Sequence, residues 1–183
     1  PYYIWAFFKN EFKGICENEA CWLKQEFAKC KLAESFLHTF SPMQPENWIK
    51  EPNSWLSNID LHKAMKQYEN AYFDFLFIGP SPINYDTIDY GKCIWEDLCS
   101  FSLENMLLRN KKKIGIIFNL DKHNEPGSHW VCVYIDIYER SIYYFDSTRV
   151  KENEVPSQII KFVNNIVLEC KERYDEIIDF KIS

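Results

Sequence analysis

A histidine and an aspartate seventeen positions apart are the residues of this chain whose types and spacing could do chemistry together. His129 opens an apolar segment that begins at Trp130, and Asp146 follows a second segment of β-branched and aromatic residues. A carboxylate that accepts a hydrogen bond from one imidazole nitrogen fixes the tautomer of the ring, and the other nitrogen can then act as a base. The pair therefore predicts a base that activates a nucleophile.

Three predicted strands position this pair. Residues 114–120 form a short apolar run, residues 130–137 alternate between apolar and polar side chains, and residues 141–145 are β-branched and aromatic. The polar residues 138–140 are few enough for a hairpin connection between the last two strands. An antiparallel hairpin brings the start of one strand to the end of its partner, so we expect the histidine and the aspartate to meet.

In this strand context, His129, Trp130 and Asp146 resemble the cysteine proteases of the ubiquitin-like-protein protease type. The family includes the SUMO proteases, the adenovirus protease and polyprotein proteases of large DNA viruses. A second segment, Trp55-Leu56-Ser57-Asn58, is similar to the Trp-Leu-Asn-Asp segment that opens a helix before the family's catalytic strands. The residue types and the order of the two segments along the chain agree with the family.

The resemblance implies a papain-like α+β fold, with a mixed central β-sheet flanked by helices, and a Cys-His-Asp triad. In such a triad His129 is the base and Asp146 is the acid that orients it. Trp55 and Trp130 match the tryptophans that clamp the narrow Gly-Gly tail of a substrate. We expect no metal and no cofactor.

The nucleophilic cysteine is expected outside this sequence. The resemblance places a glutamine, which donates to the oxyanion, and then the cysteine at positions beyond Ser183. Cys170 lies inside a helical pattern without a glutamine shortly before it, so it is not assigned as the nucleophile. We therefore expect a helical N-terminal extension, residues 1–54, and a C-terminally incomplete protease domain, residues 55–183, which is inactive on its own.

Three functions stay open on these residues. The first, which we favour, is a peptidase that cleaves viral structural polyproteins after small-residue, Gly-rich motifs, in the virion or in the viral factory of the host cytoplasm. The second is a protease that removes SUMO or another ubiquitin-like protein from its conjugates, in the nucleus or cytoplasm of a eukaryotic cell. The third is a catalytically inactive binding module of the same fold. Acetyl transfer by a similar triad is a minor alternative.

Composition favours a folded domain over a disordered chain. A chain of 183 residues with 46% hydrophobic and 17% aromatic residues can build one core of ordinary size. The net charge of −6 argues against a general nucleic-acid partner, because a Lys/Arg stripe that could neutralise phosphates is missing. The basic run Lys111-Lys112-Lys113 is predicted to be a solvated loop. No apolar stretch approaches the length of a membrane span.

The seven cysteines indicate a reducing compartment with buried thiols, because the count is odd and the chain is long for a disulfide scaffold. Cys16, Cys21, Cys30 and His38 could supply four zinc ligands, but they lack the Cys-x2-Cys spacing that is usual for such sites. Cys30 also falls on an apolar helical face. We therefore interpret these cysteines as core residues.

Further elements follow from periodicity, capping and turn signals. Ser57 and Asp60 offer a capping box at the start of a helix, and Pro156 suits the first turn of another. His62 and His123 have no matching context and are interpreted as surface or core residues. The pattern predicts helices over residues 19–39, 57–72, 94–110 and 156–177, a strand over 73–78 and a connector over 41–54.

Overall fold

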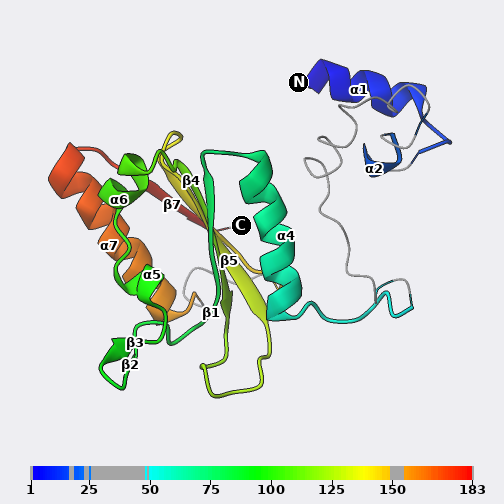
Figure 1. Ribbon diagram of the computed structural model, residues 1–183. Helices are drawn as coiled ribbons and strands as arrows, with labels where there is room; N and C mark the ends of the chain where they lie inside the picture. The colour runs from blue at the N-terminus through cyan, green and yellow to red at the C-terminus, as the bar shows by residue number, and fades with distance from the viewer. Residues whose placement is uncertain are drawn as a thin grey trace. The chain divides into compact units, whose positions relative to one another are not determined.

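The computed structural model of the protein describes residues 2–16, 19–22, 25, 48, 50–148 and 155–182. The chain divides into two compact units, residues 1–72 and 73–183 (Figure 1). The predicted boundary between an extension and a protease domain, after residue 54, stays a prediction.

The first unit contains three described helices, α1 (Tyr2–Glu11), α2 (Glu19–Trp22) and α4 (Asn58–Ala71). Helix α2 covers only the start of the helix predicted for residues 19–39, and the rest of that prediction lies outside the described residues. The connector predicted for residues 41–54 lies mostly outside them as well.

Helix α4 begins where the capping signal predicts. The Ser57 hydroxyl accepts a hydrogen bond from the Asp60 backbone N–H at 3.2 Å, and the Asp60 carboxylate accepts from the Ser57 backbone N–H at 3.0 Å. This reciprocal pair satisfies two donors that a helix start otherwise leaves unpaired. The Ser57 hydroxyl also donates to the Asp60 carboxylate at 2.7 Å, and this bond and the one from the Ser57 backbone N–H lower the pKa of Asp60. The predicted capping box is confirmed.

The second unit is built on one mixed sheet. Its strand order is β1-β4-β5-β6-β7, with parallel pairs at both ends, β1 with β4 and β6 with β7, and antiparallel pairs between them. This sheet and its helices confirm the predicted α+β class. The strands are β1 (Phe75–Pro82), β4 (Lys113–Asn119), β5 (Trp130–Asp136), β6 (Ser141–Phe145) and β7 (Asp179–Ile182).

One face of the sheet forms the core against helix α7 (Ser157–Tyr174), which lies beside the sheet in Figure 1. Successive strand residues point to opposite faces, so every second residue of the three central strands is buried here. The core residues from these strands are Ile114, Ile116, Phe118, Val131, Val133, Ile135, Ile142 and Tyr144, and α7 adds Ile159, Phe162, Val163 and Ile166.

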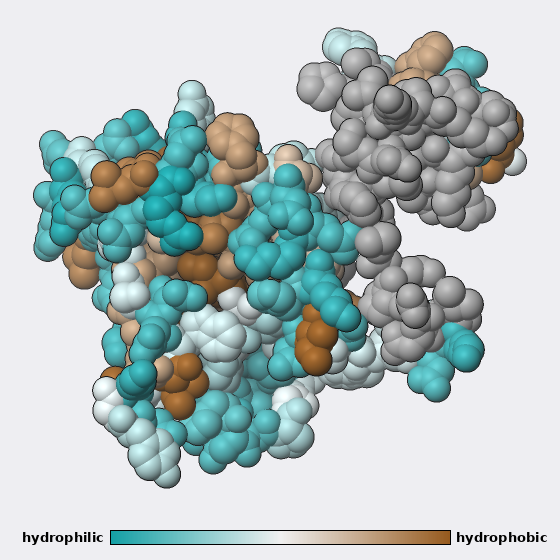
Figure 2. Space-filling view, in the orientation of Figure 1, coloured by the Kyte–Doolittle hydropathy of each residue, from teal (hydrophilic) through white to brown (hydrophobic). Residues whose placement is uncertain are grey.

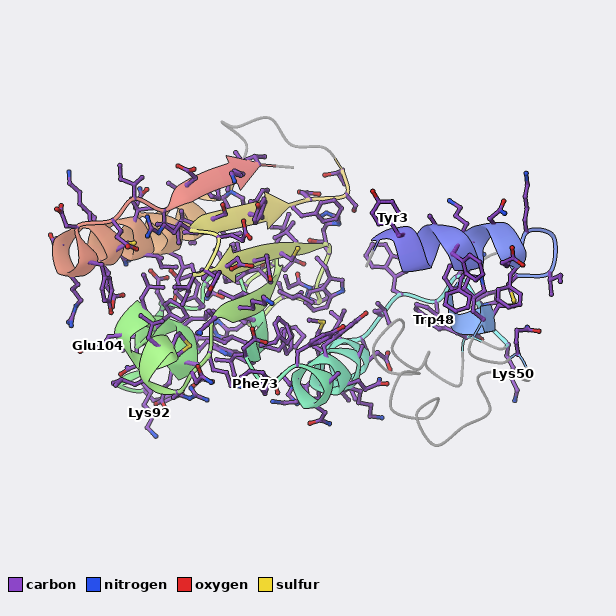
Figure 3. The ribbon with its side chains drawn as sticks, turned by 90° about the horizontal axis from the view of Figure 1, so that it is seen from above. Tyr3, Trp48, Lys50, Phe73, Lys92 and Glu104 are labelled. Atoms are coloured by element: carbon purple, nitrogen blue, oxygen red, sulfur yellow. A yellow bond between two sulfur atoms is a disulfide. The ribbon has the colours of Figure 1, made fainter. Side chains whose placement is uncertain are left out.

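The helix predicted for residues 94–110 is two short helices, α5 (Glu96–Cys99) and α6 (Leu103–Leu108). The chain breaks between them because the Ser102 hydroxyl accepts from the Asn105 backbone N–H and starts a new helix. The Glu169 carboxylate of α7 also accepts from the first N–H groups of α6. Figure 3 shows Glu104 of α6 beside α7, where it pairs with Arg173.

One strand prediction needs correction, and three further strands were not predicted. Strand β1 continues through Gly79-Pro80 to Pro82, because it lies at the sheet edge, where a proline breaks no ladder on its outer side. The hairpin of β2 (Ile88–Asp89) and β3 (Lys92–Cys93) and the edge strand β7 were not predicted. These strands are short, and β7 pairs with a strand far away in sequence, so local alternation gives little sign of them.

The cysteine and lysine predictions are also corrected in part. Disulfides join Cys16 to Cys21 and Cys93 to Cys99, so these four residues are not buried thiols. The described residues hold no cluster of side chains that could bind a metal ion, and Cys30 and His38 lie outside them.

The run Lys111-Lys112-Lys113 is not a solvated loop. Lys111 donates to the carbonyl oxygens of Phe73 and Phe75, and Lys113 pairs with Asp74 at 3.4 Å. These lysines therefore hold the start of β1 against β4.

The surface in Figure 2 is largely hydrophilic, with apolar side chains in separate patches. Within the part of the chain that the structure describes, no helix combines the length and the apolar character that crossing a membrane requires.

Candidate active site

The β5–β6 hairpin brings His129 and Asp146 together. The two strands pair from Asp136 opposite Ser141 to Cys132 opposite Phe145, so the residues before β5 and after β6 lie at the same end. The Nε2 atom of His129 lies 2.7 Å from the Oδ1 atom of Asp146. The predicted hydrogen-bond contact across paired strands is therefore confirmed.

The carboxylate of Asp146 is buried among hydrogen-bond donors. Its side chain is only 4% exposed, against 24% for that of His129. Oδ1 accepts from the backbone N–H and the hydroxyl of Thr148, at 2.8 and 2.7 Å, and Oδ2 accepts from the Tyr144 hydroxyl at 3.4 Å. Burial by itself would raise the pKa of Asp146, but the hydrogen bonds from Thr148 and His129 outweigh it and lower the pKa. The group is thus held as a carboxylate.

This contact sets the chemistry of the imidazole. When Nε2–H donates to Asp146, Nδ1 is the nitrogen that can take up a proton. The carboxylate also stabilises the imidazolium that results. The pair can therefore act as a base with an orienting acid.

The loop that leads into His129 is braced by side chains from its own start. The Asn119 amide oxygen accepts from the backbone N–H groups of Asp121 and Ser128, and the Asp121 carboxylate accepts from the Gly127 N–H and the Ser128 hydroxyl. These bonds close the β4–β5 loop immediately before the histidine. The backbone N–H of Leu120 also donates to the His129 carbonyl oxygen at 3.0 Å, so the loop closes at the histidine itself.

Gly127 is required in this brace. Its φ is +93°, which side-chain-bearing residues rarely adopt, and an added Cβ would lie 2.8 Å from the Asn119 amide nitrogen. A side chain here would thus displace the residue that holds the loop.

The described thiols lie away from this pair. Cys132 follows His129 by three positions along the strand, so it points to the opposite face, and burial raises its pKa. Cys170 is buried in α7, where burial and the nearby Glu176 raise its pKa. Arg140, which also influences Cys170, precedes β6, whereas Asp146 follows it, and five strand residues separate these ends by roughly 16 Å.

Sequence comparison relates the strands that carry this pair to a known family. Residues 102–179 match the model of the Ulp1 protease family, C-terminal catalytic domain. These residues therefore form a Ulp1-like domain. The match runs from the start of α6 to β7 and contains both His129 and Asp146.

Two viral proteins are relatives of this chain. A protein of Acanthamoeba polyphaga mimivirus named as a thiol protease is 32% identical over 163 residues, which cover 84% of this chain and 51% of the relative. A cysteine protease of African swine fever virus is 21% identical over 170 residues, which cover 86% of this chain and 61% of the relative. The chain thus spans about half to three-fifths of the length of these relatives.

The fold of this chain also has a counterpart among crystal structures. A protease of African swine fever virus superposes with a TM-score of 0.54 at 15% identity, over 99% of this chain and 68% of the other. At this low sequence identity, the similarity shows a shared fold and nothing more.

Sequence reasoning missed part of this site. Thr148, which the sequence patterns did not single out, donates to the Asp146 carboxylate. The Asn119 and Asp121 brace was also missed, although polar residues directly after a strand are a common sign of a side-chain-capped loop. Trp55 belongs to the first unit and Trp130 to the second, so the clamp predicted between them stays a prediction.

Proposed function

We propose that the full-length protein is a cysteine peptidase in which His129 is the general base and Asp146 is the orienting acid of a Cys-His-Asp triad. The observation that carries this proposal is the 2.7 Å contact between the two side chains, with the carboxylate buried, inside a Ulp1-family domain. A buried dyad of this kind is suited to proton transfer next to a nucleophile.

The reaction follows from these groups. His129 takes the thiol proton at Nδ1, and the thiolate attacks the carbonyl carbon of the scissile bond. The imidazolium then protonates the leaving amine, the C–N bond breaks, and a thioester remains. His129 next deprotonates a water molecule that attacks the thioester, which releases the acid and restores the thiol. Asp146 stabilises the imidazolium between these steps.

The nucleophile in this proposal comes from a part of the full-length protein outside residues 1–183. Two observations support this choice. Cys132 and Cys170 lie away from His129 and have raised pKa values, which disfavour the thiolate. The mimivirus relative is also about twice as long as the matched region, so further protein can complete the site.

The proposed substrate is a viral structural polyprotein, cleaved after small-residue, Gly-rich motifs in the virion or the cytoplasmic viral factory. Support comes from the relatives, which are named as proteases and belong to two large DNA viruses. The family resemblance makes Trp55 and Trp130 the proposed residues that select small substrate side chains, because larger side chains would collide with an indole ring.

The dyad is tested with full-length protein and a fluorogenic peptide that carries Gly-Gly before the scissile bond. We expect His129→Ala and Asp146→Ala to lower kcat/KM by on the order of 10²–10⁴. The matched control His123→Ala should keep wild-type turnover, since His123 is exposed and contacts Asn84. Unchanged turnover by the His129 variant would refute its role as the base.

The nucleophile is tested on the same protein. Iodoacetamide should abolish turnover, and mass spectrometry of the alkylated protein then identifies the reactive cysteine. We expect Cys170→Ser to retain activity. Loss of activity in that variant without loss of folding would assign Cys170 as the nucleophile instead.

A further inference from the structure

We propose that Thr148 is a positioning residue that fixes the Asp146 carboxylate in the orientation that His129 needs. The inference rests on the proposed peptidase function. It starts from one oxygen atom: Oδ1 of Asp146 accepts from the Thr148 backbone N–H at 2.8 Å, from the Thr148 hydroxyl at 2.7 Å and from His129 Nε2 at 2.7 Å.

A carboxylate held by a single donor can rotate about its side-chain bonds. Here the two donors of Thr148 lie on the same oxygen as the imidazole, so they fix which oxygen faces His129. The second oxygen has a longer contact, 3.4 Å, to the Tyr144 hydroxyl, whose residue is fully buried. The hydroxyl contact of 2.7 Å and the backbone contact of 2.8 Å therefore act together on this orientation.

The hydroxyl also acts on the charge of the site. Hydrogen bonds that favour the ionised form of an acid lower its pKa, and both donors of Thr148 act in this direction on Asp146. An ionised Asp146 is required to stabilise the imidazolium that forms when the thiol loses its proton. Thr148 is therefore coupled to catalysis through Asp146 and does not touch the substrate.

A purely local role for Thr148 is the competing explanation. Asp146 and Thr148 also form a turn after β6 through the backbone N–H of Thr148. That bond survives when only the hydroxyl is removed. The comparison of Thr148→Val with Thr148→Ser therefore separates the hydroxyl from the turn, since both variants keep the backbone donor and only serine keeps the oxygen.

The experiment uses full-length protein and the Gly-Gly peptide across a pH series. We expect Thr148→Val to lower kcat by about tenfold with a smaller change in KM, which corresponds to loss of one charge-assisted hydrogen bond. The acid limb of its pH profile should move to higher pH, because the Asp146 carboxylate becomes easier to protonate. The kcat of Thr148→Ser should stay within about twofold of the wild-type value. At neutral pH the urea midpoint of Thr148→Val should fall slightly, because the hydroxyl helps to hold the pKa of Asp146 down, and that of Thr148→Ser should stay at the wild-type value.

A readout without turnover separates this proposal from the peptidase proposal. Carbon NMR of the Asp146 carboxyl should titrate at higher pH in the valine variant and at the wild-type pH in the serine variant. An inactive wild-type protein with this pattern would contradict the peptidase function and keep the positioning role. The positioning role would be overturned if the valine variant matched wild type in both its Asp146 titration and its kinetics. It would also be overturned if the serine variant lost as much activity as the valine variant.

Discussion

The ionisation of Asp146 matters for folding as well as for catalysis. Its pKa is lowered in the folded state, because hydrogen bonds from Thr148 and His129 outweigh burial. A lowered pKa contributes stability that is present above the unfolded value and lost as pH falls through the folded value. The Asp146 carboxylate therefore contributes a pH-dependent part of the stability at this end of the β5–β6 hairpin.

We expect the stability difference between wild type and Asp146→Asn to depend on pH. At neutral pH the wild type has the charge-assisted hydrogen bonds and the variant lacks them, so wild type should be more stable. Below about pH 4 the difference should shrink, because the aspartate becomes protonated. Urea unfolding of both proteins from pH 7 to pH 3 measures this. A difference that stays constant over this range would contradict the assigned ionisation.

At the scale of elements, the β2–β3 hairpin turns through two residues in the left-handed region. Asp89 pairs with Lys92, so Tyr90 and Gly91 form the turn, with φ values of +47° and +77°. Such a turn favours Asn-Gly, and a bulky residue at its first position is strained. Tyr90 is also 99% exposed, so its ring contributes little packing.

We expect Tyr90→Asn to stabilise the second unit by about 1 kcal/mol, because asparagine adopts the left-handed conformation more readily. The matched control is Gly91→Ala, which meets no neighbouring atom and should destabilise through backbone strain alone. Thermal denaturation of both variants checks the pair. A lower melting temperature for the asparagine variant would show that the tyrosine ring contributes to folding.

At the scale of the whole molecule, the clamp prediction concerns residues from both units. Trp55 is 74% exposed in the first unit, and Trp130 is partly buried at the start of β5 in the second. Because Trp55 is exposed and lies just before the capping box of α4, it contributes little to the core of its own unit. A role in substrate contact is consistent with that exposure.

We expect Trp130→Ala in the full-length protein to lower kcat/KM about tenfold, through poorer positioning of the scissile bond. The partly buried ring should make the loss of stability smaller than the roughly 3–5 kcal/mol of a core tryptophan. Peptide kinetics and the urea midpoint are measured on one preparation. A collapsed midpoint with near-normal turnover of the folded fraction would assign Trp130 to the core.

The sequence by itself determined the elements that carry the dyad and the meeting of His129 with Asp146. Alternation of apolar residues is a local property, and a three-residue polar break leaves a hairpin as the short connection. The strand predicted over residues 141–145 is β6 itself, and the helix predicted over 156–177 contains α7.

Only the tertiary structure decided what surrounds the dyad. The hydroxyl of Thr148 reaches Asp146 because the chain turns back after β6, and Glu169 caps α6 across 65 positions of sequence. Strand β7 pairs with β6 across the whole of α7. Such contacts depend on which faces meet after folding, and no local pattern of residue types encodes them.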